Sequence, residues 1–286
     1  MSMVNYGTPE EVEPGVFRLT APNPSAYTST GTQSYIVGTA DVAVIDPGPD
    51  DPAHVAALMA AMAGRPIRAI VCTHTHRDHS PAAASLKAAT GAPIIGCAPL
   101  SLEDVGPRAD ASFDTAYVPD RVLEDGESVR GTDWTLTAVA TPGHTSNHLA
   151  FALEGTGVLF TGDHVMGFAT SVVSPPDGDM GAYMASLDKL LARDDRVYFP
   201  GHGPEVTNPQ RLVRGMAGHR RQREGQILRL LHEGEAPIEA MVERMYVGLD
   251  PRLKGAAGRS VLAHLIDLRS RGRVTGEEEG AWSIRS

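Results

Sequence analysis

The chain has 286 residues, of which 42% are hydrophobic and 21% charged, and its formal net charge is −10. This composition is that of an ordinary globular protein, long enough for one large core with a smaller appended domain. No apolar stretch approaches the roughly 20 residues that span a bilayer, and the acidic N-terminus lacks the layout of a signal peptide. Only Cys72 and Cys97 could pair, so no disulfide framework is expected. Together these features predict a cytoplasmic protein that does not associate with membranes.

Charge is distributed unevenly along the chain. Residues 215–286 contain 12 Lys and Arg against 10 Asp and Glu, whereas the other 214 residues contain 13 against 25. A polyanion therefore meets no general electrostatic attraction from the larger part of the chain. DNA binding is not expected, although an RNA substrate held by local contacts is not excluded.

Short strands alternate with turns and helices over the first 210 residues. Runs rich in β-branched and aromatic residues, bounded by Pro, Gly, Asn and Ser, predict strands; these are Val16–Thr20, Gln33–Val37, Val42–Ile45, Ile67–Cys72, Pro93–Ile95, Trp134–Ala140, His148–Leu153, Gly157–Phe160 and Val197–Phe199. Helix-favouring patterns predict helices over Ala53–Ala63, Pro81–Ala89 and Met180–Arg193. Several strands end in loops that carry His or Asp, which predicts a site at one rim of a sheet assembly.

The character of the chain changes at about residue 210. Helices are predicted over Leu212–Glu233, over Pro237–Tyr246 and around Leu262–Leu268, followed by a hairpin over Val274–Ile284. Three short helices and a hairpin describe a winged-helix-like α+β module. We therefore predict two domains, 1–210 and 211–286.

The segment THTHRDH at residues 73–79 has an unusual density of metal-ligand groups and follows the buried strand Ile67–Cys72. Alternation along an extended chain places His74 and His76 on one side. The next turn can bring Asp78 and His79 into the same space from a second direction. Neutral imidazole and carboxylate are ligands that zinc and similar cations prefer. This segment predicts a metal-dependent hydrolase.

Three later loops each place one more potential ligand after a strand: His144 in TPGHT, Asp163 in FTGDHV and His202 in PGHG. Taken singly, a Gly-His pair is usually a turn, and an aspartate after a strand is usually a cap or turn residue. Because the chain also carries the cluster at 74–79, these three residues are predicted to be metal ligands: a two-metal site needs more ligands than that cluster supplies.

The motifs HTHRDH, TPGHT, TGD and PGHG, in this order and spacing, resemble those of the metallo-β-lactamase superfamily over roughly residues 15–210. The resemblance implies a four-layer αββα sandwich with a two-metal site at one edge of its sheets. It further implies a first metal held by His74, His76 and His144, a second held by Asp78, His79 and His202, and Asp163 bridging both. A shared carboxylate lets two dications lie about 3.5–4 Å apart. Two Zn²⁺ ions are expected, and iron or manganese fit the same ligands.

Within this superfamily, the chain is similar to the beta-lactamase-like protein 2 group. The segment GTQSYIVG at 31–38, the turn DPG at 46–48 and the winged-helix-like tail after PGHGP carry this likeness. Gln33 stands where that group usually has Asn, and the insert Ser174–Asp179 is expected to reshape the pocket. Animal members of the group are associated with endoribonuclease activity, so the resemblance allows an RNA substrate.

The predicted chemistry is hydrolysis of an ester, thioester or phosphodiester by hydroxide shared between two metals. Asp78 is expected to orient this nucleophile or take a proton. His148, four residues after His144, is predicted to have a structural role; the alternatives are that it supports a ligand from outside or donates a proton to the leaving group. Asp46 is expected to hydrogen-bond a ligand imidazole. The basic run Arg214, Arg220, Arg221 and Arg223 is either a solvated helix face or a track for phosphates.

Two other functions remain open at this point. A thioesterase of the hydroxyacylglutathione hydrolase kind shares the metal motifs, although its C-terminal part differs. A DNA-binding regulator would use the tail to read operators and the metal domain to sense a ligand, but the tail's small positive balance argues against it. The oligomeric state is not predicted.

Overall fold

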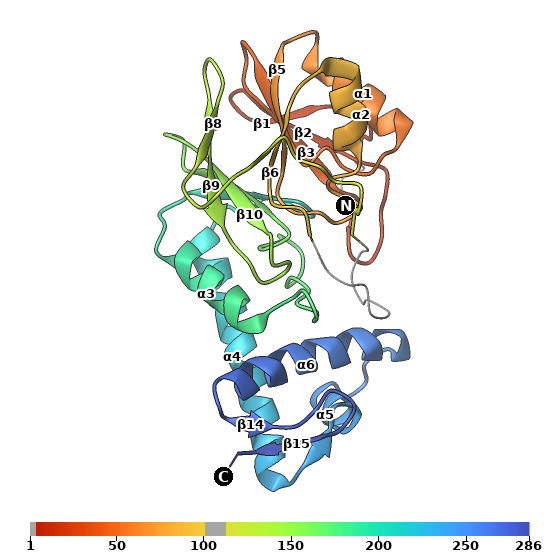
Figure 1. The fold of residues 1–286 in the computed structure, drawn as a ribbon, viewed down its shortest axis with the longest axis vertical. Coiled ribbons are helices and arrows are strands. Elements are labelled where there is room, and N and C mark those ends of the chain that lie inside the picture. Colours follow the sequence, from red (N-terminus) through yellow and green to blue (C-terminus); the bar gives the residue numbers. More distant parts are fainter. Residues whose placement is uncertain (1–3, 101–112, 286) are drawn as a thin grey trace.

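The computed structural model describes residues 4–100 and 113–285 (Figure 1). Its first sheet has seven strands. These strands lie side by side in chain order: β1 (Glu10–Glu13), β2 (Val16–Thr20), β3 (Gln33–Val37), β4 (Val42–Ile45), β5 (Ile67–Cys72), β6 (Ile94–Gly96) and β7 (Arg121–Val122). The first four pair antiparallel, and β4 to β7 pair parallel. The helices α1 (Pro52–Met62) and α2 (Ala82–Thr90) occupy the connections between the parallel strands.

The second sheet has five strands in the order β12-β11-β10-β9-β8. Their bounds are β8 (Ser128–Arg130), β9 (Thr135–Ala140), β10 (Leu149–Leu153), β11 (Val158–Gly162) and β12 (Val197–Pro200). Only β11 and β12 are parallel, because the helix α3 (Met180–Leu191) carries the chain back between them.

Alternation along the five-stranded sheet separates two cores. Phe151 and Phe160 face the seven-stranded sheet and share a core with its strands and with α1 and α2. Their neighbours Ala150 and Leu159 face the other way and pack with α3 and with the first half of the next helix. The layers are therefore helix, sheet, sheet, helix, and the predicted four-layer αββα class is confirmed.

The long helix α4 (Pro209–Glu233) leads from this sandwich into the C-terminal part (Figure 1). That part contains β13 (Ala236–Pro237), α5 (Ile238–Met245), a 3₁₀ turn (Pro251–Leu253), α6 (Lys254–Ser270), β14 (Val274–Thr275) and β15 (Ala281–Ile284). The three strands form a small antiparallel sheet, and Trp282 is buried in a third core with Ile227 of α4. The small winged-helix-like α+β unit is therefore present.

Because α4 packs against the sandwich through Val213 and Met216 and against the tail through Ile227 and Leu231, it crosses the predicted boundary at 210/211. That boundary stays a prediction. Within the described residues, none of the helices is both long and apolar enough to cross a membrane.

Candidate metal centre

The seven predicted ligands come together where strands of both sheets end. His74, His76, Asp78 and His79 follow β5, His144 follows β9, Asp163 follows β11 and His202 follows β12. Two groups with potential to hold a metal consist of these ligands alone: one contains His74, His76, His144 and Asp163, and the other contains Asp78, His79 and His202. A third such group joins Asp46 to His74 and His79. Asp78 alone among the seven is not fully buried.

In the first group, nitrogen atoms of three imidazoles point at one another. His74 Nε2 lies 3.0 Å from His76 Nδ1, and His144 Nε2 lies 3.1 Å from the same atom. Asp163 Oδ2 is 3.7 Å from His144 Nε2. These separations fit nitrogen atoms that surround one metal position, since zinc lies about 2.0–2.1 Å from each nitrogen that binds it.

The hydrogen bonds made by the outer ring nitrogens of His74 and His144 determine which nitrogen of each ring is protonated and which carries a lone pair. Thr73 Oγ1 donates to Asp46 Oδ2 at 2.8 Å, so it accepts from His74 Nδ1 at 2.9 Å and leaves His74 Nε2 unprotonated. His144 Nδ1 donates to the Val172 carbonyl at 2.6 Å, which leaves its Nε2 unprotonated as well. The lone pairs of His74 Nε2 and His144 Nε2 therefore point into the same buried space beside His76 Nδ1. A cation placed there would accept them, so this donor set fits a bound metal.

The second group has the same arrangement with more negative charge. His79 Nε2 and His202 Nε2 lie 3.2 Å apart, and Asp78 Oδ2 is 3.1 Å from His202 Nε2. Asp163 Oδ1 lies 3.3 Å from His202 Nε2 and 3.4 Å from His79 Nε2. The two oxygens of Asp163 thus face different groups, which is the placement a bridging carboxylate needs.

Asp46 supports both groups from behind. Its Oδ2 accepts from His79 Nδ1 at 3.0 Å and from Thr73 Oγ1, and its Oδ1 accepts from the Thr73 backbone N–H at 2.7 Å. The expectation that Asp46 hydrogen-bonds an imidazole is confirmed. Asp46 has a φ of 47°, a left-handed conformation that Asp and Asn tolerate better than most residues.

Burial and the neighbouring charges shift the pKa values of several of the predicted ligands. Burial alone would lower the pKa of His202, but the neighbouring Asp163 and Asp78 raise it to about 9. Burial likewise opposes ionisation of Asp163, yet His202 and His79 hold its pKa well below the ordinary value. Burial and the nearby His79 lower the pKa of His74. Protons on His79 and His202 offset the carboxylates without a metal, and a dication supplies the same positive charge.

His148 is buried beside the first group, with both ring nitrogens hydrogen-bonded inside the protein. Its Nε2 accepts from the Asp163 backbone N–H at 3.2 Å, so its Nδ1 donates to Thr141 Oγ1 at 2.8 Å. Burial lowers its pKa well below the ordinary value. Of the predicted roles, these contacts favour a structural one, support of the Asp163 loop, over proton donation to a leaving group.

Three groups support the ligands through contacts that the sequence does not predict. The Val172 carbonyl that orients His144 has no signal of its own, because every residue carries a carbonyl. Gly201 leaves room for the site, since a Cβ there would lie 2.6 Å from Asp163 Oδ1 and from His79 Cε1. Gln33 Nε2 donates to the Gly203 carbonyl at 2.6 Å, so the residue that departs from the group's usual Asn ties β3 to the His202 loop.

The basic run on α4 is not one continuous face. Arg221 is exposed, but Arg220 is only 5% exposed and its guanidinium lies 5.3 Å from the Tyr183 ring. Both predicted readings of Arg220, a solvated face and a phosphate track, are therefore wrong. Helical periodicity does not show this, because the neighbouring elements that cover Arg220 are distant in sequence.

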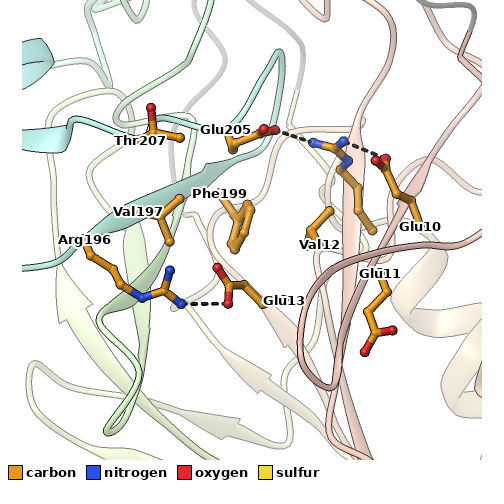
Figure 2. A pocket seen from close by; sticks show the side chains of 10 residues that line it. Glu10, Glu11, Val12, Glu13, Arg196, Val197, Phe199, Glu205 and Thr207 are labelled. Carbon is orange, nitrogen blue, oxygen red and sulfur yellow. Dashed lines mark hydrogen bonds and ion pairs between the residues drawn. The ribbon is translucent and has the colours of Figure 1, made fainter.

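Two surface pockets differ in the side chains that line them. One of about 480 Å³ holds acidic and basic side chains in ion pairs, such as Arg18 with Glu10 and Glu205, and none of the seven predicted ligands lines it (Figure 2). A groove of about 650 Å³ is lined by apolar side chains such as Met166, Phe168 and Leu212 and by the charged Arg211 and Glu205, and it too is lined by none of the seven. Its Phe168 lies against Gly203, the residue after His202.

Comparisons with known proteins agree with this geometry. Residues 27–202 match the model of the metallo-beta-lactamase superfamily, and residues 238–282 match the beta-lactamase associated winged helix domain. The chain is 30% identical to the beta-lactamase-like protein 2 homolog of Drosophila melanogaster over 272 residues, which are 91% of this chain and 89% of that protein. The predicted likeness to the beta-lactamase-like protein 2 group is confirmed.

Other relatives carry different names. The chain is 33% identical to the atrochrysone carboxyl ACP thioesterase AgnL7 of Paecilomyces divaricatus over 226 residues, which are 77% of this chain and 65% of that protein, so it spans just under two thirds of that relative. The crystal structure of TTHA1623 in a di-iron-bound form matches with a TM-score of 0.54 and 30% identity, covering 68% of this chain and 96% of that one. The chain belongs to the metallo-beta-lactamase superfamily and carries the His/Asp cluster typical of its metal-dependent hydrolases.

Proposed function

We propose that this protein hydrolyses carboxylic esters or thioesters at a site that holds two metal ions. The observation that carries this proposal is the placement of Asp163, whose two oxygens face two separate sets of convergent imidazole nitrogens. Two bound dications lower the pKa of water towards neutrality and polarise the bond under attack. The surrounding side chains would hold the ions, orient the water and bind the substrate.

The first ion would bind His74, His76 and His144, and the second would bind Asp78, His79 and His202, with Asp163 shared. Zinc suits this imidazole-rich donor set. The solved relative in a di-iron-bound form makes iron the alternative that metal analysis has to separate from zinc, with manganese a third choice.

Asp78 is the residue we assign to the attacking water. It is the most accessible of the seven, and its Oδ2 accepts from Thr32 Oγ1 at 3.2 Å. This contact and the adjacent His202 hold the carboxylate in place, where it can orient water or take its proton. His148 keeps the Asp163 loop in position through the Asp163 backbone N–H.

The groove that contains Phe168 supports an acyl substrate. Its Met and Leu side chains and the partly exposed Phe168 suit an apolar acyl or aryl group, while Arg211, although Glu205 lines the same groove, suits an anionic end. The thioesterase name of a relative at 33% identity supports the same class. A phosphodiester such as RNA is the second candidate, because Arg211 offers a phosphate contact in this groove.

A regulator that binds duplex DNA has less support. The pocket between α5 and α6 in the tail is lined by Glu239, Glu243, Glu278 and Glu279 beside Lys254 and Arg259. Carboxylates at such a surface repel phosphates. Free, buried thiols at Cys72 and Cys97 are compatible with the cytoplasmic location that we propose.

The test is turnover of a panel containing acyl thioesters, carboxylic esters, a phosphodiester and single-stranded RNA, with the metal content measured. We expect thioester or ester hydrolysis and two bound ions. The double variant His76→Ala with Asp78→Ala removes one ligand from each set and should abolish metal binding and turnover. His232→Ala, at an exposed position of α4, is the matched control and should behave as wild type. Full activity of the double variant would sink the proposal, and RNA cleavage without acyl hydrolysis would replace its substrate class.

A further inference from the structure

The segment 171–179, which we call the strap, runs between β11 and α3 and contacts the loop that carries His144 at three points. The Val172 carbonyl accepts from His144 Nδ1. The Asp177 carboxylate accepts from the Ser146 backbone N–H at 3.2 Å, and the Asp179 backbone N–H donates to the Gly143 carbonyl at 3.0 Å. The orientation of the His144 ring therefore depends on where the strap lies.

Two arginines from the C-terminal helices hold the other side of the strap. Arg220 of α4 donates to the Ser171 carbonyl, directly before Val172. Arg259 of α6 donates to the Pro175 carbonyl, and its Nε lies 3.5 Å from Ser174 Oγ. Arg259 lies inside the stretch that matches the winged helix domain, so contacts from outside the sandwich fix a segment of the metal centre.

The burial of Arg220 is costly unless its contacts compensate for it. Arginine is seldom fully buried without a charged partner. Among the described residues, no carboxylate forms an ion pair with Arg220. Its guanidinium instead contacts the Ser171 carbonyl and the Tyr183 ring. Tyr183 OH and Ser171 Oγ both donate to the His164 carbonyl, so strap, α3 and α4 are joined in one hydrogen-bonded unit.

The second ligand set is supported differently. His79 is held by Asp46 on the sandwich, and His202 Nδ1 faces the Gly31 carbonyl at 3.4 Å. Thr32, which donates to Asp78, also belongs to the N-terminal sheet region. The strap contacts described above therefore involve the His144 loop and not these residues.

We propose that Arg220 and Arg259 are positioning residues that orient His144 through the strap, so that the C-terminal helices set the metal affinity of the first ligand set but not of the second. This inference rests on the proposed two-metal function. Loss of a group that orients a metal ligand lowers metal affinity by roughly 10–100-fold. A role in stability alone would weaken both sets together or neither.

The variants are Arg220→Met and Arg259→Met, which keep much of the apolar stem and remove the donors. Arg221→Met, next to Arg220 on the exposed side of α4, and Arg244→Met, exposed on α5, are the matched controls. Arg259→Lys keeps one donor and should restore part of the effect, which covers the case in which Arg259→Met does not fold. Thermal unfolding of each variant identifies those that remain folded.

The first readout needs no metal. A long-range ¹H–¹⁵N spectrum of the chelator-treated protein, labelled on histidine, reports the ring tautomer of His144. We expect the Nδ1–H form in wild type and in both controls, and a loss of this preference in the two Arg→Met variants. An unchanged His144 signal in folded variants would overturn the inference.

The second readout is a zinc titration of the full chain against a competing chelator. Wild type should bind two equivalents, and each Arg→Met variant should bind one of them roughly 10–100-fold more weakly while the other is unchanged. Equal weakening of both equivalents, or of neither, would overturn the inference. If wild type binds no metal while the His144 tautomer still responds to Arg259→Met, the proposed function fails and the strap contact stands.

Discussion

The two ligand sets of the metal centre differ in charge and in what supports them. The set of His74, His76 and His144 consists of imidazoles alone, and the outer nitrogens of His74 and His144 meet uncharged acceptors, Thr73 Oγ1 and the Val172 carbonyl. The set of Asp78, His79 and His202 has a carboxylate of its own, and a second carboxylate, Asp46, backs His79. Asp163 is common to both.

The difference in charge determines how each set would hold a cation. Carboxylates attract a dication from several ångströms away and tolerate some misplacement, because Coulomb energy changes slowly with distance. Lone pairs on neutral imidazoles bind only along fixed directions, so the first set depends more on the orientation of its rings. We therefore expect the second set to respond to changes in charge and the first to changes in the surrounding hydrogen bonds.

The largest effect is expected from the group that both sets share. Asp163→Asn keeps the shape but removes the charge that offsets two dications, so both sites should lose affinity. Turnover should fall by at least about 10³-fold, equivalent to about 4 kcal/mol of transition-state stabilisation. Steady-state kinetics with metal analysis measure this, and the exposed Asp188→Asn is the control. Retention of two ions and near-normal turnover would show that the sets are independent.

Removal of the metals should come next, with an effect on stability. A ligand at about 1,000 times its Kd stabilises the folded state by about 4 kcal/mol, which for a chain of this size corresponds to a Tm shift on the order of 10 °C. Calorimetry before and after treatment with a chelator tests this. An unchanged Tm would contradict metal binding at a site this deeply buried.

The chelator-treated protein should also become less stable as the pH rises. The pKa of His202 is raised to about 9 from an ordinary value of 6.5, so its contribution to stability is complete below about pH 6.5 and is lost as the pH rises through 9. The pKa of His79 is raised as well. The metal-loaded protein should not show this loss, because the cation replaces these protons. Parallel pH profiles of the two forms would contradict the charge balance assigned to the second set.

A smaller effect is expected from Asp46→Asn. Asn tolerates the left-handed backbone at this position, so the change mainly removes the charge behind His79. Affinity at the second set should fall roughly 10–100-fold, and affinity at the first set less, because Asp46 reaches His74 only through Thr73. Competition titrations resolve the two equivalents. A greater loss at the first set would reverse the comparison.

The smallest effect is expected from Gln33→Asn, which restores the residue usual in the resembling group. The shorter side chain cannot keep both the Gly203 carbonyl and the Tyr35 hydroxyl as partners. The cost should be about 1 kcal/mol of stability, with a change of less than about tenfold in affinity at the second set. Thermal unfolding and metal titration measure both, and a larger loss than that of Asp46→Asn would show that the His202 loop is held mainly by Gln33.

Much of the fold was predictable from local patterns. The strands β2 to β5 begin and end at the predicted residues, and most of the other predicted strands and helices occur within a few residues of their expected bounds. The helix α6 contains the predicted Leu262–Leu268 but begins earlier, at Lys254. The unpredicted strands β1, β7, β8 and β13 have two to four residues each, and partners rather than composition define them. β1 reads EEVE, a polar run that forms a strand only because β2 lies beside it.

Residue types and their spacing along the chain are enough to predict that seven ligand-type residues follow strand ends, because they define what each loop can offer. How these residues are held follows only from the tertiary structure. The Val172 carbonyl, the left-handed Asp46 and the buried Arg220 act across long separations in sequence. A backbone carbonyl is the same in every residue, and an arginine on an amphipathic helix has the same pattern whether water or protein covers it. Orientation of a ligand depends on such contacts, so it follows from packing and not from the motif.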